Sequence, residues 1–253
     1  MNYRINDAFC AYESNLNLII QNYETQGQPY GNQERNSLKT FELNDRVVNV
    51  KSFKIPNVFN QIAYSFFRKS KACRSYEYAN KLINLEIGTP QPIAYYESKA
   101  FFLFKKSFYI SEHLDYQLTY RELIDEFDYP DHERILRAFV KFTYELHEKQ
   151  ILFLDHSPGN TLIKKENGTY KFYLVDLNRM KFKALSFEER MKNFDRLSKH
   201  KFMVEIMSDE YAKLSGISYD KVYAAMWQNI QSFQEKFYRK KRLKKALKFW
   251  KKS

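Results

Sequence analysis

Two polar side chains in the segment "LDHSPGNTLI" (residues 154–163) could do chemistry together. Asp155 and Asn160 lie five positions apart, and Pro158-Gly159 between them predicts a tight turn joining two apolar segments. Taken alone, an Asp and an Asn at this spacing are also typical of a capped turn. The other polar residues of the chain decide between a turn and an active-site loop.

Phosphoryl transfer needs a particular set of groups. It requires a carboxylate that orients or deprotonates the attacking hydroxyl, oxygen ligands for Mg²⁺, and a lysine on the phosphates held by a glutamate. Besides Asp155 and Asn160, the sequence offers Asp176 at the end of the apolar segment "LVDL", Lys51 in "VNVKSF" and Glu77 in "SYEYANKLINLE". Each residue alone is weak evidence, because a lone lysine in a strand usually faces solvent. The combination predicts an active-site loop.

The elements that must position these residues change in character along the chain. The first part predicts a hairpin over 36–54 with its turn at Asn44-Asp45, and helices over 58–72 and 75–86, the second of which ends at Gly88. Three strands follow, over 93–97, 100–104 and 107–114. The second part predicts a helix over 131–151, a hairpin through Asn167-Gly168, and a long helix from about Ser218. This order predicts an α+β fold of two lobes, residues 1–111 and 112–253.

This order and spacing resemble the protein-kinase-like superfamily: a mostly β N-lobe with helices and a mostly helical C-lobe. The resemblance implies that Asp155 is the catalytic base and that Asn160 and Asp176 bind magnesium. It also implies that Lys51 contacts the α/β-phosphates of ATP and pairs with Glu77. Adenine would meet backbone groups of the hinge "YISEHL", at about Glu112 to Leu114.

A narrower resemblance covers most of the chain. The segments "RNSLKTFELNDRVVNVKSFK", "GTPQPIAYYE", "LDHSPGNTLI" and "LVDLNRMKF" are similar to the bacterial lipopolysaccharide kinase family. Membership would imply an ATP- and Mg²⁺-dependent kinase that phosphorylates a sugar hydroxyl of the lipopolysaccharide inner core, on heptose or 3-deoxy-manno-octulosonic acid (Kdo). It would act from the cytoplasm on an anionic glycolipid.

Several positions depart from the protein-kinase pattern. Phe153 stands two residues before the base, where a histidine is usual, and we expect it to brace the loop by packing. The Asp-Phe-Gly trio reads Asp176-Leu177-Asn178. No G-x-G-x-x-G occurs, so Gly27 and Gly31 are the candidates for the nucleotide-covering loop. We expect His156 to form hydrogen bonds within the loop and Ser157 to cap a local turn.

The choice of Lys51 contains a conflict. Val48 and Val50 predict an inward face on which position 52, not 51, comes next. Lys54 is the alternative if the register slips by three. The family resemblance, and not the periodicity, favours Lys51.

The formal net charge of +12 indicates an anionic partner. Arg179 and Lys181, just after Asp176, could form a basic rim for an acidic sugar. The tail "FYRKKRLKKALKFWKKS" combines many Lys and Arg residues with an apolar stripe that includes Leu247 and Trp250. It predicts a basic C-terminal helix in peripheral contact with the inner membrane. A helix packed on its lobe with a solvated face is the alternative, and we do not expect nucleic-acid binding.

The remaining composition favours the cytoplasm. Cys10 and Cys73 are far apart and fit a reducing compartment. The N-terminus shows no apolar core of signal-peptide length, and no segment is long and apolar enough for a membrane span. Two alternatives stay open: a protein kinase or small-molecule phosphotransferase of the same fold, and a non-catalytic nucleotide-binding pseudokinase.

Overall fold

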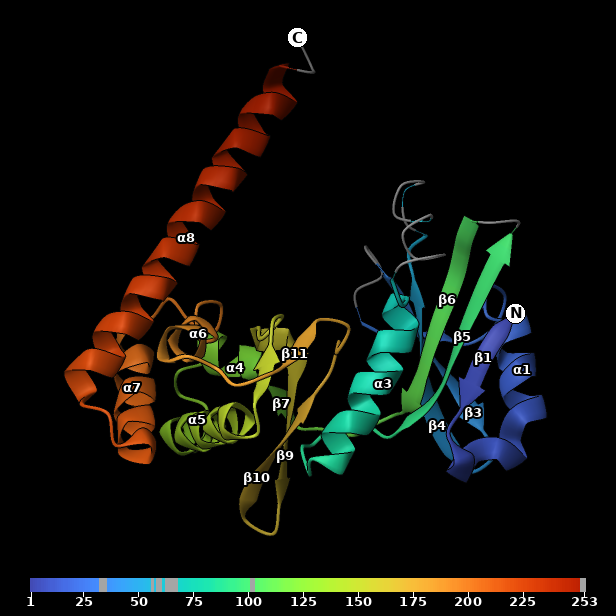
Figure 1. Cartoon of the computed structure of the whole chain (residues 1–253), viewed down its shortest axis with the longest axis horizontal. Coiled ribbons are helices and arrows are strands. Elements are labelled where there is room, and N and C mark those ends of the chain that lie inside the picture. The colour runs from blue at the N-terminus through green and yellow to red at the C-terminus, as the bar shows by residue number, and fades with distance from the viewer. Residues whose placement is uncertain (32–35, 56, 58–60, 62–67, 101–102, 251–253) are drawn as a thin grey trace. The chain divides into compact units, whose positions relative to one another are not determined.

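The chain folds into two compact units in the computed structural model (Figure 1). The structure describes residues 1–31, 36–55, 57, 61, 68–100 and 103–250, with only the backbone for 100 and 246–250. Unit 1 comprises Met1–Asp115 and Tyr173–Arg179, and unit 2 comprises Tyr116–Phe172 and Met180–Ser253. The units change at residue 115, near the predicted boundary at 111, but the segment with Asp176 belongs to unit 1.

Unit 1 is built on an antiparallel sheet whose described strands have the order β1-β5-β6-β4-β3-β2. Their bounds are β1 Asn2–Ile5, β2 Gln28–Pro29, β3 Asn36–Leu43, β4 Arg46–Phe53, β5 Pro92–Ala100 and β6 Leu103–Glu112. The predicted hairpin is β3–β4, and its turn residue Asn44 has the positive φ of 56° that Asn tolerates. The prediction of three strands after Gly88 is wrong. Ala100 ends β5 and pairs with Leu103 at the start of β6, so the described residues of the predicted middle strand belong to two antiparallel neighbours.

Helices cover both faces of this sheet (Figure 1). The 3₁₀ helix η1 (Asp7–Tyr12) and α1 (Glu13–Gln21) lie on the face to which Val48 and Val50 point, and together they form an apolar core. Helix α3 (Lys71–Asn84) packs against β5 and β6 on the other face. Ser70 caps α3 by accepting a hydrogen bond from the Cys73 amide at 3.0 Å, so this helix begins earlier than predicted. The helix predicted over 58–72 falls mostly outside the described residues.

Unit 2 is mostly helical. Its helices are α4 Tyr120–Asp125, α5 His132–Glu148, η2 Pro158–Asn160, α6 Phe187–Lys192, α7 Lys201–Ser215 and α8 Tyr219–Trp250. Its short strands are β7 Leu118–Thr119, β8 Ile151–Phe153, β9 Thr161–Glu166, β10 Thr169–Leu174 (which runs on into unit 1) and β11 Met180–Phe182. The predicted hairpin at Asn167-Gly168 is β9–β10, with positive φ at both turn residues.

The amphipathic pattern of the helices explains their packing. The predicted stripe of α5 is buried from Ile135 to Leu146, and α8 packs on α6 and α7 through Val222, Met226 and Ile230. No helix in the described part of the chain is both long and apolar enough to cross a membrane.

Candidate functional site

The loop that carries Asp155 lies between β8 and β9 in unit 2. Pro158 begins the single turn of η2, where its fixed φ suits a helical start. This turn brings Asn160 back to the base: its side-chain nitrogen donates to the Asp155 carbonyl oxygen at 2.8 Å. The spacing of five residues therefore places Asp155 and Asn160 next to each other.

A buried chain of hydrogen bonds supports this loop from behind. The Asn193 side chain donates to the Phe153 carbonyl at 2.8 Å and contacts His147 Nε2 at 3.1 Å through its oxygen. His147 Nδ1 lies 3.0 Å from the Tyr211 hydroxyl. Because the Asn193 oxygen can only accept, His147 donates through Nε2–H and accepts from Tyr211 through Nδ1. Burial lowers the pKa of His147 to about 4, which keeps this arrangement neutral.

Phe153 is fully buried and packs near His156, with 5.8 Å between ring centroids, so it braces the loop by packing as expected. The expectation for His156 is wrong: its ring lies between Phe153 and Phe139, and neither nitrogen has a hydrogen-bond partner among the described residues. Burial lowers its pKa to about 3, with a further contribution from His147. Ser157 precedes η2, but its side chain makes no capping hydrogen bond.

Arg196 also contacts the predicted base. It lies between α6 and α7, and its Nη1 atom donates to Asp155 Oδ1 at 3.2 Å. Sequence reasoning missed Arg196 because 41 residues separate it from Asp155 and no local pattern marks it.

Lys51 and Asp176 form an ion pair in unit 1, with 2.7 Å between Lys51 Nζ and Asp176 Oδ1. The predicted pair of Lys51 with Glu77 is not formed, because Glu77 on α3 pairs with Lys69 instead. Lys54 lies beyond the end of β4 and is exposed, so the three-residue register slip is wrong. The structure therefore brings the predicted phosphate ligand to the predicted metal ligand.

Asp176 is held by the connection between α3 and β5. The Leu174 amide donates to the Gly88 carbonyl, and the Thr89 hydroxyl donates to the Leu174 carbonyl, both at 2.8 Å. Asp176 itself has a φ of 60°, a left-handed conformation that is uncommon outside glycine and concentrates at functional sites. Asn178 donates to the same carboxylate oxygen as Lys51, at 2.7 Å.

Asp176 in unit 1 and Asn160 in unit 2 each offer an oxygen atom of the kind that magnesium binds. Carboxylate and amide oxygens are its preferred protein ligands, and it is usually bound by one or two carboxylates with substrate phosphates. The nitrogen of the Asn160 amide is engaged with Asp155, which leaves the amide oxygen to face a cation. The Asp176 carboxylate already attracts two donors through one oxygen.

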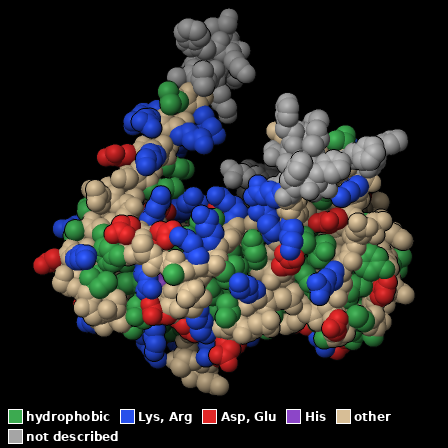
Figure 2. Space-filling model, in the orientation of Figure 1, with side chains coloured by type: hydrophobic (Ala, Val, Ile, Leu, Met, Phe, Trp, Pro, Cys, Tyr) green, Lys and Arg blue, Asp and Glu red, His purple; other side chains and the backbone are tan. Residues whose placement is uncertain are grey.

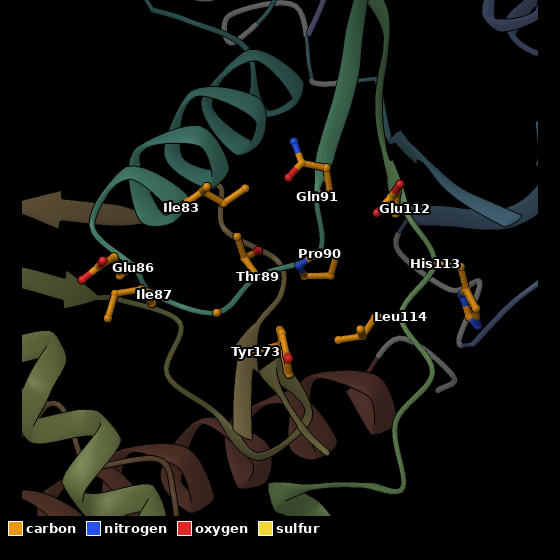
Figure 3. A pocket seen from close by; sticks show the side chains of 11 residues that line it. Ile83, Glu86, Ile87, Thr89, Pro90, Gln91, Glu112, His113, Leu114 and Tyr173 are labelled. Atoms are coloured by element: carbon orange, nitrogen blue, oxygen red, sulfur yellow. The ribbon is translucent and has the colours of Figure 1, made fainter. Parts of the chain in front are cut away.

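The predicted hinge borders a cavity of about 410 Å³ within unit 1 (Figure 3). Glu112, His113 and Leu114 line it together with Ile83, residues 86–91 and Tyr173. Neither Lys51 nor Asp176 lines this cavity, so it is separate from their ion pair.

The hinge backbone is partly engaged in the sheet. The amides of Glu112 and His113 donate to Gln91 and Val47, both at 2.9 Å, and the Glu112 carboxylate pairs with Arg46. In the described part of the chain, the backbone of Leu114 makes no hydrogen bond. Of the three predicted adenine contacts, Leu114 is thus the one whose backbone amide is left for the adenine.

The remaining predicted residues are placed as follows. Gly27 precedes β2 with a φ of 81° and lies against the Phe41 ring, whereas Gly31 follows β2 at the start of the β2–β3 connection. Arg179 in unit 1 and Lys181 on β11 of unit 2 are both exposed.

Comparisons with known proteins place the chain in a family. The lipopolysaccharide kinase (Kdo/WaaP) family matches residues 25–218, about three quarters of the chain. Among solved structures, WaaP in complex with acyl carrier protein has a TM-score of 0.63 at 14% identity, covering 92% of this chain and 99% of that chain. The MAP kinase LmaMPK10 from Leishmania major has a TM-score of 0.48 at 15% identity, covering 85% and 65%. No curated protein matches the sequence.

The likeness to WaaP and the order of the elements confirm the predicted α+β, protein-kinase-like fold. The family match includes strand β4 with Lys51, the loop with Asp155 and the segment with Asp176. The chain therefore belongs to the lipopolysaccharide kinase (Kdo/WaaP) family and is a phosphotransferase of that family.

Proposed function

We propose that the protein transfers the γ-phosphoryl group of ATP to a sugar hydroxyl of the lipopolysaccharide inner core, on Kdo or heptose. The observation that carries this proposal is the ion pair of Lys51 and Asp176, two residues 125 positions apart that meet at 2.7 Å. A lysine and a carboxylate held together in this way are the groups that phosphoryl transfer requires on its phosphates and its metal.

In this reaction Asp155 receives the proton of the attacking hydroxyl. The hydroxyl oxygen bonds to the γ-phosphorus, the bond from that phosphorus to the bridging oxygen of ADP breaks, and the proton passes to the Asp155 carboxylate. Asn160 and Asp176 would hold Mg²⁺, which would neutralise phosphate charge. Lys51 binds the α/β-phosphates, Leu114 meets the adenine, and Gly31 lies in the loop that covers the nucleotide. Most of the rate enhancement would come from positioning and charge neutralisation.

The substrate is an anionic glycolipid, and two basic regions support this assignment. Arg179 and Lys181 are exposed close in sequence to Asp176. From Lys236 to Lys245, every side chain of α8 is exposed, and seven of these ten residues are Lys or Arg. Figure 2 shows Lys and Arg side chains along this end of the helix. Phe237, Tyr238 and Leu243 are exposed among them. We propose that this basic helix binds the anionic cytoplasmic surface of the inner membrane, where the substrate lies. The side chains of Leu247 and Trp250 fall outside the described residues.

The main test is phosphoryl transfer from labelled ATP with Mg²⁺ to purified inner-core glycolipid, read by mass spectrometry. Asp155→Ala should lower the rate about 10²–10⁴-fold, the contribution of a positioned acid–base group, and Asp176→Ala should lower it at least as much. Asp128→Ala is the matched control, since Asp128 is an exposed carboxylate of the same unit as Asp155. Wild-type rates in either catalytic variant would refute the assignment. Binding of ATP–Mg²⁺ without transfer would indicate a pseudokinase instead, and transfer to protein a protein kinase.

The membrane proposal has its own test. Replacing Lys240, Lys241, Lys244 and Lys245 by Gln should weaken binding to anionic vesicles by about 4 kcal/mol, or roughly 10³-fold, at low salt. Gln at four exposed lysines elsewhere in unit 2, residues 171, 199, 201 and 213, is the control with the same charge change. If both variants lose the same affinity for anionic vesicles, the basic part of α8 is not a specific membrane-binding surface. Acyl carrier protein, with which WaaP was solved, belongs in the same assay, because its capture by α8 would replace the membrane as partner.

A further inference from the structure

Arg196 forms a hydrogen bond with the carboxylate of Asp155, the proposed catalytic base. Its Nη1 atom donates to Asp155 Oδ1 at 3.2 Å, and both side chains are partly accessible, at 35% and 19% exposure. The acceptor hydroxyl must therefore share or replace this contact when it binds.

The Arg196 guanidinium stacks on an aromatic ring and is partly exposed, rather than buried in an ion pair. It lies over the Phe233 ring of α8, 5.6 Å from the centroid, and its Nε atom is 3.7 Å from Asp195. Lys192 and Lys236 also act on the Asp195 carboxyl, whose pKa burial raises against these positive charges. Arg196 thus stands among further cations, and a second anion next to it would meet attraction from several sides.

Arginine is suited to such an anion. Its planar fork binds carboxylate and phosphate groups through two parallel hydrogen bonds, and stacking on an aromatic ring leaves the edge of the fork free. At Arg196 the edge faces Asp155. An acceptor that carries an acid group near its reacting hydroxyl could therefore engage Arg196 and Asp155 at once.

We propose that Arg196 binds the acidic group of the acceptor sugar and so places the reacting hydroxyl beside Asp155. The proposal rests on the proposed function, because it names what distinguishes the acceptor of that reaction. It predicts that the enzyme selects a sugar acid, or a sugar with an adjacent phosphate, over its uncharged counterpart.

The test compares two acceptors that differ only in charge: the methyl glycoside of Kdo and the methyl ester of the same compound. Arg196→Gln should raise the KM for the acid about 10- to 150-fold, the loss of a charged hydrogen bond. The KM for the ester, the KM for ATP and kcat should stay within threefold. Arg196→Lys should recover part of the affinity for the acid, because it keeps the charge but loses the fork. Arg134→Gln, an exposed arginine of the same unit, is the control.

Each outcome decides the proposal. Equal effects of Arg196→Gln on acid and ester, or a fall in kcat at unchanged KM, would overturn it and make Arg196 a positioning residue for Asp155. If the wild type transfers phosphate to neither acceptor nor to the inner-core glycolipid, the proposed function fails, and direct titration of acid and ester still tests Arg196. Tighter binding of the acid by the wild type than by Arg196→Gln supports the site, and equal binding overturns it.

Discussion

Mild acid should destabilise unit 2, because two fully buried histidines in it must stay neutral. The pKa values of His147 and His156 are lowered from 6.5 to about 4 and about 3, mainly by burial. Each residue therefore binds a proton more readily in the unfolded chain. The stability that this contributes is complete above about pH 6.5 and is lost as the pH falls below it.

The size of the loss follows from these values. At pH 5.0 each histidine lies about 1.5 units below its unfolded pKa and still above its folded one, so each costs about 2 kcal/mol at 1.36 kcal/mol per unit. Together they should remove about 4 kcal/mol between pH 7.5 and 5.0, a large part of a typical stability of about 5–15 kcal/mol. Carboxylates with lowered pKa values, such as Asp209, lose their contribution only at lower pH.

Urea unfolding followed by tryptophan fluorescence measures this loss in the right place, because both tryptophans, Trp227 and Trp250, lie in α8 of unit 2. His156→Leu should halve the pH dependence of the free energy of unfolding. It should not lower this free energy at pH 7.5, since neither ring nitrogen of His156 has a partner among the described residues. His147→Leu should also reduce this dependence but cost about 1–3 kcal/mol at pH 7.5, because the Tyr211 hydroxyl and the Asn193 side-chain oxygen each lose a buried hydrogen bond. A wild-type loss below about 1 kcal/mol, or an unchanged slope in His156→Leu, would refute the reasoning.

Two further predictions concern the support of the site. Gly27→Ala should destabilise unit 1 by about 1–3 kcal/mol, because a Cβ there would lie 2.4 Å from the Phe41 ring and φ is positive. Gly31→Ala also has a positive φ, but a Cβ there would meet open space, so this variant should lose less stability. Thermal unfolding of both variants measures the difference. Asn193→Ala should cost about 1–3 kcal/mol, because it leaves the Nε2 atom of His147 unpaired, whereas the Phe153 carbonyl keeps a hydrogen bond from the His156 amide at 3.2 Å. It should also lower kcat for phosphoryl transfer, and a variant with normal kcat would show that the buried chain supports the fold alone.

The sequence predicted best what depends on neighbouring residues. Both hairpin turns carry an Asn whose side chain tolerates positive φ, and the five-residue spacing of Asp155 and Asn160 closes around Pro158. These features need only local geometry. The long helix from residue 218 and the buried stripe of α5 follow from periodicity in the same way.

The conflict over Lys51 has a physical explanation in the coverage of the sheet. Val48 and Val50 are fully buried under η1 and α1, while Lys51 and Phe53 lie on the face covered by α3, where Lys51 Nζ is 5.5 Å from the Phe53 ring centroid. The sequence pattern predicts neither β1 nor α1, and without them only one face of the sheet is expected to be interior. With helices on both faces, period two cannot say which face holds the lysine.

Contacts between distant segments could not be predicted. Arg196 reaches Asp155 across 41 residues, and Lys51 reaches Asp176 rather than Glu77 because the α3–β5 connection holds the strand end at Leu174. One available signal was overlooked: His147 follows Leu146 on the apolar face of α5, and a polar side chain in such a stripe indicates a buried partner.

Helix α8 carries residues of both proposed binding surfaces. Phe233, the platform of Arg196, and Lys236, the first residue of the basic surface, lie less than one turn apart on it. By reciprocal linkage, if an acidic acceptor and an anionic surface favour the same position of this helix, each raises the affinity for the other by the same factor. The protein would then bind a soluble acceptor sugar more weakly than the same sugar on a membrane. Adding anionic vesicles that carry no acceptor would raise the affinity for the soluble sugar.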